Sequence, residues 1–250
     1  MIQMTHHSIH ERGFTLVEMA MVLAIVTLLL TGLVPTISGQ LEQQRVTETR
    51  RQLNEIQQAL IGFAIINGRL PCPASSGSNG IESPAGGACT NFHNGFVPGA
   101  TLGLNSLNEN GQVLDAWDNP IRYAVTSWDS TSPVQSDVYT TANGMANTGM
   151  STLSPNLLVC ATATGIGSSC ASGQALTADP GVPAVLYSTG KNGTSGGTGT
   201  DEAENLDNDR FFVSHTPTAS AATNGEFDDM VVWISNQVLL SRLVNAGKLP

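Results

Sequence analysis

Carboxylates are concentrated near the C-terminus of this 250-residue chain, where residues 201–229 hold eight of its 20 acids and a single Arg or Lys, Arg210. On a segment rich in glycine and asparagine, carboxylate oxygens suit Ca²⁺, which takes about six to eight oxygen ligands in flexible geometry. The candidate ligands are Asp201, Glu204, Asp207, Asp228 and Asp229. No cofactor is required, and calcium is the ion that the sequence suggests. The spacing is not that of an EF-hand loop, and a solvated acidic surface stays the alternative.

The other reactive side chains do not form a catalytic pattern. Residues 193–197 read as G-x-S-x-G around Ser195, but a nucleophile elbow needs a strand before it and a helix after it, and the flanks here are rich in glycine and threonine. His93 and His215 stand alone in polar segments and are expected at the surface. We therefore expect no enzyme, with a hydrolase built on Ser195 as a distant alternative. A net charge of −10 disfavours a nucleic-acid partner.

An apolar run extends from Phe14 to Val34 and contains one ionisable side chain, Glu18. At about 1.5 Å per residue, a helix over this run is about 31 Å long, close to the hydrocarbon thickness of a bilayer. The polar segment before it ends in Arg12-Gly13. A secretory signal instead carries its apolar stretch ahead of the cleavage site. The sequence thus predicts a membrane span over 14–34 that stays on the mature protein.

The segment Gly13-Phe14-Thr15-Leu16-Val17-Glu18 resembles the processing site of type IV pilins and type II secretion pseudopilins. The resemblance implies that a prepilin peptidase cuts after Gly13 and N-methylates Phe14. It also implies that Glu18 acts in assembly and that Pro35 is the helix-breaking proline of this family. The implied partners are other pilin or pseudopilin subunits, the peptidase and an assembly platform in the inner membrane.

Glu18 also has a physical interpretation of its own. A carboxylate in an apolar helix is costly and usually functional, although in the first turn it can reach the membrane interface and gain from the helix dipole. In a packed filament core it needs a cation, which the Phe14 amine of a neighbouring subunit can supply. We favour this assembly role over the alternative of a tolerated first-turn acid.

After Pro35, which can kink a helix, residues 36–66 follow the pattern of an amphipathic helix. Its apolar stripe consists of Leu53, Ile56, Leu60 and Phe63. On another face, Arg51 is spaced to pair with Glu48 and Glu55. We expect the helix to end near Asn67-Gly68, because glycine is favoured just past a helix end.

The remainder, residues 68–250, is expected to be a head on the outer side of the membrane. With the N-terminus in the cytoplasm, as the positive-inside rule weakly indicates, this head lies in the periplasm or outside the cell, where disulfides persist. Four cysteines allow three pairings. We prefer Cys72 with Cys89 and Cys160 with Cys170. Zinc bound by these cysteines and His93 is disfavoured, because no C-x-x-C spacing is present.

The head is expected to be an α+β unit in which the long helix packs on an antiparallel sheet. The predicted strands lie at 121–127, 157–161, 184–188, 210–213 and 230–234. A closing helix follows Ser235, its expected cap, with Val238, Leu239, Leu243 and Val244 as its stripe and Gly247 beyond its end. The segment Asp115–Pro120 resembles a turn of major pseudopilins, a group that holds calcium in a loop near the C-terminus.

These observations predict a leader at 1–13, a filament-core or membrane helix at 14–34, its amphipathic continuation at 35–67 and a head at 68–250. The predicted function is that of a structural subunit, either a pilin, a minor pilin or a pseudopilin. A head rich in glycine, serine, threonine and asparagine favours a pilin or minor pilin that touches surfaces or caps the filament, whereas the Trp117 turn and the acidic stretch favour a pseudopilin. The alternative is a membrane-tethered periplasmic binding or adhesion module that never polymerises and needs no cleavage at Gly13.

Overall fold

The computed structural model describes residues 13–127, 137–193 and 199–249, and for residues 30–38 it describes the backbone alone. The chain divides into two compact units, Met1–Arg45 and Val46–Pro250. Helix α1, Leu16–Asn67, contributes residues to both units. Apart from Gly13, the predicted leader lies outside the described residues.

The first unit consists of the start of α1 and the residues before it. Its side chains from Gly13 to Leu29 are all exposed. The helix continues through Pro35, so this proline lies inside α1 and does not end it. Across the described residues, we find no helix that is both long enough and apolar enough to cross a membrane.

In the second unit, the remaining part of α1 buries the predicted apolar stripe. Leu53 and Leu60 are fully buried and Ile56 nearly so, whereas Phe63 is half-buried, with the Arg69 guanidinium 5.2 Å from its ring centroid. The predicted ion pairs of Arg51 with Glu48 and Glu55 are confirmed on the exposed face. As predicted, α1 ends at Asn67, and Gly68 follows with a φ of 67°.

A four-stranded antiparallel sheet lies at the centre of the second unit. Its order is β1 (Gly95–Phe96), β2 (Arg122–Val125), β4 (Ala184–Ser188) and β6 (Met230–Ile234). Because side chains alternate along a strand, Tyr123 and Leu186 face one hydrophobic core, whereas Ala124 and Tyr187 face another. The sheet is therefore covered on both faces.

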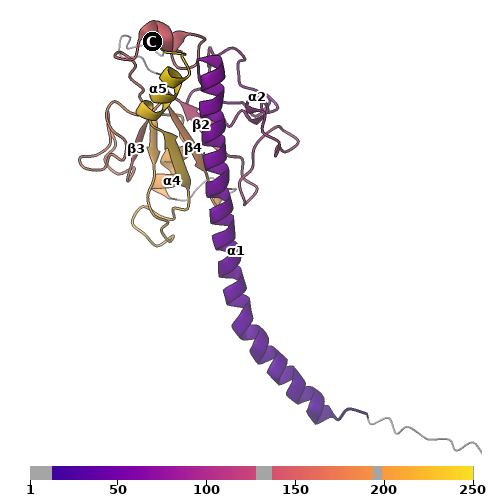
Figure 1. Ribbon diagram of the computed structural model, residues 1–250. Helices are drawn as coiled ribbons and strands as arrows, with labels where there is room; N and C mark the ends of the chain where they lie inside the picture. Colours follow the sequence, from indigo (N-terminus) through magenta and orange to yellow (C-terminus); the bar gives the residue numbers. More distant parts are fainter. Residues whose placement is uncertain (1–12, 128–136, 194–198, 250) are drawn as a thin grey trace, which may run out of the picture. The chain divides into compact units, whose positions relative to one another are not determined.

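The two faces have different covers. On one face, α1 and α5 (Asn236–Asn245) pack together and share a core that includes Leu53 and Leu239; Figure 1 shows α5 beside the end of α1. On the other face, Val159 and Phe212 come from β3 (Leu158–Cys160) and β5 (Phe211–Val213), which pair in parallel. Three short helices complete the head: α2 (Gly99–Leu102), α3 (Gly144–Thr148) and α4 (Thr200–Leu206).

The predicted α+β class and antiparallel sheet are confirmed. All five predicted strand runs contain a strand, and β4 and β6 have the predicted bounds. The closing helix is also present, but only Leu239 and Leu243 of its predicted stripe are buried, whereas Val238 is 46% exposed and Val244 38%. The Ser235 side chain makes no capping hydrogen bond. The parallel β3–β5 pair was not predicted, because two three-residue strands carry no pairing signal.

Two disulfides close loops of the head. Cys72 is bonded to Cys89 and Cys160 to Cys170, the sequential pairing that we preferred. All four cysteines are buried: Cys72 and Cys160 are 0% exposed, Cys89 is 8% exposed and Cys170 is 9% exposed. Bridges over such loops stabilise a fold by about 2 to 4 kcal/mol each, mainly by restricting the unfolded chain.

A buried ion pair fixes the chain beside the first disulfide. The Arg69 guanidinium donates to both carboxylate oxygens of Glu82, at 2.6 and 2.8 Å, and the Cys72 N–H donates to the same carboxylate at 3.1 Å. Both side chains are largely buried, with 11% and 6% exposed. Burial by itself raises the pKa of Glu82, but Arg69 and the backbone N–H of Cys72 outweigh it and hold that pKa below its ordinary value.

We expect Glu82→Gln to lower the free energy of unfolding by about 3 kcal/mol at neutral pH, because it leaves the Arg69 charge buried and uncompensated. The loss should shrink as the pH falls through the lowered pKa of Glu82, because the wild-type carboxylate is then itself protonated and its contribution to stability disappears. Urea unfolding of the full chain in detergent, followed by circular dichroism, measures this. Glu55→Gln, which breaks an exposed pair, is the control and should change little. Equal losses in both variants would contradict the prediction.

Candidate functional site

The first candidate site is the start of α1. The backbone N–H and the hydroxyl of Thr15 both donate to Glu18 Oε2 at 2.9 Å, and the Glu18 N–H donates to Thr15 Oγ1 at 3.2 Å. This reciprocal pair is a capping box, in which the residue before the helix and the third residue of the helix each accept a hydrogen bond from the other's backbone N–H. Thr15 therefore holds the Glu18 carboxylate at the start of α1 through one of its two oxygens, Oε2.

The surroundings of this carboxylate are apolar and open. Phe14 is 84% exposed and Leu16 90%. A shallow hollow beside Glu18 is lined by Phe14, Met19, Met21, Val22 and Ile25. Contiguous apolar surface of this kind marks a place where another apolar surface binds. Gly13 and Phe14, the predicted processing residues, are both accessible.

The second candidate site lies in the acidic stretch, which the fold separates into two groups. Within each group, one carboxylate oxygen per residue lies within 4.8 Å of the others. The buried group consists of Glu202, Asp228 and Asp229, of which Glu202 and Asp229 are buried and Asp228 is half-buried. The more exposed group consists of Glu204, Asp207 and Asp209. The predicted ligands Asp228 and Asp229 thus lie together, whereas Glu204 and Asp207 lie in the other group.

In the buried group, protein donors hold some oxygens and leave others open. Asp228 Oδ2 accepts the N–H groups of Lys191 and Asn192 at 3.2 and 3.3 Å, while its Oδ1 is buried without a hydrogen-bond partner among the described residues. Asp229 Oδ2 accepts from Asn205 Nδ2 at 2.7 Å. Glu202 accepts from the Asn192 amide at 2.9 Å. Three carboxylates are therefore oriented toward one another by neutral donors.

The electrostatics of this group favour a cation. Burial, opposed by the Asn205 hydrogen bond and reinforced by the charges of Glu202 and Asp228, raises the pKa of Asp229 to about 8. Burial and the charge of Glu202 raise the pKa of Asp228 to about 6. No salt bridge joins Asp228 or Asp229 to a basic side chain in the part of the chain that the structure describes. Such a group either takes up protons or binds a metal ion.

The sequence analysis did not select Glu202 as a candidate ligand, because it predicted no helix in this segment. Glu202 and Asn205 lie one turn apart on α4 and are both buried. The signal was present in the acids directly after Gly199-Thr200, since acidic residues are favoured in the first turn of a helix.

Asp201 belongs to neither acidic group. Its carboxylate accepts from the Ala163 N–H at 2.6 Å, the Thr162 hydroxyl at 3.1 Å and the Asn224 amide at 2.9 Å. His215 Nε2 lies 3.2 Å from it, and the His215 ring stacks on Phe227. Protein donors therefore occupy Asp201, which ties α4 to the loop of the second disulfide and to the segment after β5.

A turn over Asp115–Pro120 connects α1 to the loop that holds Asp228. The Ala116 N–H donates to Thr49 Oγ1 of α1 at 3.1 Å. Asp115 Oδ2 accepts from the Ser188 hydroxyl at 2.6 Å, and Asn119 Nδ2 donates to the Gly190 carbonyl at 2.6 Å. The segment that resembled a pseudopilin turn thus contacts both the helix and the residues beside the buried acids.

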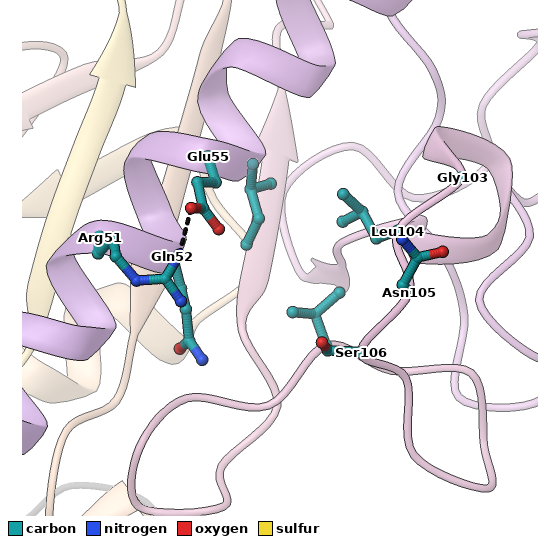
Figure 2. Close-up of a pocket in the computed structure, with 9 residues that line it drawn as sticks. Arg51, Gln52, Glu55, Gly103, Leu104, Asn105 and Ser106 are labelled. Atoms are coloured by element: carbon teal, nitrogen blue, oxygen red, sulfur yellow. Dashed lines mark hydrogen bonds and ion pairs between the residues drawn. The ribbon is translucent and has the colours of Figure 1, made fainter.

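A cavity of about 260 Å³ opens between α1 and the segment after α2. Figure 2 shows Arg51, Gln52 and Glu55 on the helix side and Leu104, Asn105 and Ser106 across from them. The Arg51 charge is already paired with Glu48 and Glu55. The cavity therefore presents amide and hydroxyl groups beside a neutralised arginine and carries no catalytic arrangement.

The two histidines are not the isolated surface residues that we expected. His93 Nε2 lies 3.2 Å from Ser127 Oγ, and burial lowers the pKa of His93. Ser127 is only 4% exposed, and its N–H donates to Asn156 Oδ1 at 3.3 Å, so the half-buried His93 contacts a buried residue. His215 contacts Asp201 as described. Ser195 of the G-x-S-x-G string lies outside the described residues.

Residues 9–34 match the family model of the prokaryotic N-terminal methylation motif. The chain has the N-terminus of a type IV pilin-like prepilin. The resemblance seen in Gly13–Glu18 is thereby confirmed, and the motif is typical of prepilin-type precursors of pili and pseudopili, a structural rather than catalytic family. The motif also indicates membrane anchoring and processing by a prepilin peptidase. No curated protein and no solved structure matches the chain.

We expect Asp201→Ala to lower the free energy of unfolding of the prepilin by about 2 kcal/mol, because it leaves buried backbone and amide donors without an acceptor. Glu204→Ala, one turn further along α4, should be neutral or stabilising. Burial and the charges of Asp207 and Asp209 raise the pKa of Glu204 to about 7, so its loss relieves repulsion. Denaturant unfolding of both variants measures the difference, and a greater loss for Glu204→Ala would contradict these roles.

Proposed function

We propose that this prepilin is a structural subunit of a type IV pilus or a type II secretion pseudopilus, cleaved after Gly13, N-methylated on Phe14 and polymerised through α1. The observation that carries the proposal is the methylation motif over residues 9–34, in which Glu18 is the one ionisable side chain after the cleavage point. Before assembly, residues 14–34 anchor the chain in the inner membrane with its N-terminus in the cytoplasm.

The geometry at Glu18 supports a pairing mechanism. Thr15 uses only Oε2 of the carboxylate, so Oε1 is available to a second donor. Cleavage after Gly13 creates a primary amine on Phe14, and methylation leaves it able to carry a positive charge. When α1 packs among other helices, the apolar surface around Glu18 becomes buried, and an uncompensated carboxylate there is strongly destabilising. The register that places a neighbour's Phe14 amine at Oε1 is then favoured.

The head supports an outward location. Its two disulfides are of the kind that persists in the periplasm or outside the cell. The second unit also has hydrophobic cores of its own on both faces of its sheet. We therefore propose that α1 assembles the filament and that the head forms its surface.

Gly13→Lys should block cleavage, because the side chain obstructs the peptide bond that the peptidase must reach. Glu18→Gln should leave cleavage and methylation intact but reduce assembly at least tenfold, because the amide carries no charge to pair with the amine. Cleavage is measured by the intact mass of the membrane-extracted protein, with and without the prepilin peptidase. Assembly is measured by the amount of protein in the sheared filament fraction. A wild-type chain that still begins at Met1 would contradict the proposal and favour the tethered, non-polymerising module.

We further propose that the buried acids Glu202, Asp228 and Asp229 bind calcium. The donor set fits, since all three offer hard oxygen ligands and Asp228 Oδ1 is buried without a partner among the described residues. Gly190 permits this arrangement, because a Cβ there would lie 2.2 Å from Asp228 Oδ1. A bound cation would favour the ionised forms of Asp228 and Asp229, whose pKa values are raised in its absence.

Adding Ca²⁺ to the full chain in detergent should raise its unfolding temperature, because a ligand that binds only the folded state stabilises it by about 2.7 kcal/mol at a hundredfold excess over Kd. Chelation should reverse the effect, and Asp228→Asn should abolish it. Glu204→Gln, in the other acidic group, is the control and should keep it. A wild-type unfolding temperature that does not respond to Ca²⁺ would remove calcium from the proposal and leave the assembly mechanism standing.

A further inference from the structure

The loop at residues 188–192 lies between the buried acids and the turn at Asp115–Pro120. On the acid side, the N–H groups of Lys191 and Asn192 hold Asp228 Oδ2, and the Asn192 amide donates to Glu202. These contacts determine where the oxygens of two of the three proposed ligands lie. The position of the loop therefore sets the geometry of the group.

On its other side, the same loop is held by the turn. Asn119 Nδ2 donates to the Gly190 carbonyl at 2.6 Å, and the Ser188 hydroxyl, which accepts from the Gly190 N–H at 3.1 Å, donates to Asp115 at 2.6 Å. Asn119 is 5% exposed, so water does not readily replace its hydrogen bond. Loss of this contact would release the loop from the turn.

The turn is itself ordered and attached to α1. Asp115 Oδ1 accepts the N–H groups of Trp117 and Asn119, both at 2.8 Å. The Ala116 N–H donates to Thr49, which is fully buried. A continuous series of hydrogen bonds and buried contacts thus leads from α1 through the turn and the loop to Asp228.

We propose that Asn119 is a positioning residue for the calcium site and that cation binding at the buried acids is coupled to docking of the 115–119 turn on α1. This inference rests on the calcium site proposed above and adds residues that touch no ligand. Because coupling between two sites is reciprocal, a turn that strengthens calcium binding must itself be stabilised by calcium. Calcium would then order the part of the head that contacts the helix used for assembly.

The first test compares calcium affinity among variants of the full chain in detergent, by calorimetric titration with CaCl₂. Asn119→Ala should weaken binding at least tenfold, although every carboxylate is kept. Asn156→Ala is the matched control, since Asn156 is 6% exposed and its hydrogen bonds go to Thr126 and Ser127, away from the loop. It should change the affinity less than twofold. Equal affinities for the wild type and Asn119→Ala, or equal losses in both variants, would overturn the inference.

The second test needs no variant and therefore does not depend on whether Asn119→Ala folds. Hydrogen exchange of the wild type is measured with CaCl₂ and with a chelator. Calcium should slow exchange at the Ala116, Trp117 and Asn119 N–H groups at least fivefold. The turn at residues 108–112 is the internal control and should not respond. Unchanged exchange at 116–119 would overturn the inference. A wild type that binds no calcium would overturn it together with the calcium site, while cleavage at Gly13 tests the assembly proposal separately.

Discussion

Burial of one stripe of α1 against the antiparallel sheet is the interaction on which the head depends. Leu53, Ile56 and Leu60 fill the space between the helix and the strands that carry Tyr123 and Leu186. Each side chain of this size contributes about 1.5 to 3 kcal/mol when it is buried. Two hydrogen bonds add to this packing: the Ala116 N–H of the turn donates to Thr49, and the Gln57 amide donates to the Trp233 carbonyl of β6.

The head has few charges and few large aromatic residues, and it compensates with localised cross-links. The disulfide between Cys72 and Cys89 and the ion pair of Arg69 with Glu82 hold the same stretch of chain after α1. The second disulfide and Asp201 hold the loop beside α4 in a similar way. Loops rich in glycine and serine lose much conformational entropy on folding, so these fixed points have a large effect on the stability of the head.

Each proposed site has a carboxylate oxygen that is open to a further partner: Glu18 Oε1 at the start of α1, and Asp228 Oδ1 in the buried group. Glu18 lies in apolar surroundings and is capped by the neutral Thr15. Glu202, Asp228 and Asp229 face one another and are held by neutral donors. In the first case the compensating cation is proposed to come from another subunit, and in the second from the solvent. The two proposals thus rest on the same electrostatic rule, that a charge which becomes buried needs a partner.

The sequence by itself determined the features that depend on local pattern. The Gly13–Glu18 motif, the stripe from Leu53 to Leu60 and the strands at Ala184–Ser188 and Met230–Ile234 follow from residue type and spacing, which neighbouring residues along the chain fix. Tertiary structure alone decided which acids lie together. Glu202 lies far from Asp228 in the sequence but accepts a hydrogen bond from its N–H, whereas the adjacent Asp201 accepts from the Ala163 N–H in the loop of the second disulfide. Spacing along a chain does not encode such proximity, because it arises only when the loop at 188–192 is held between the Asn119 turn and the acids.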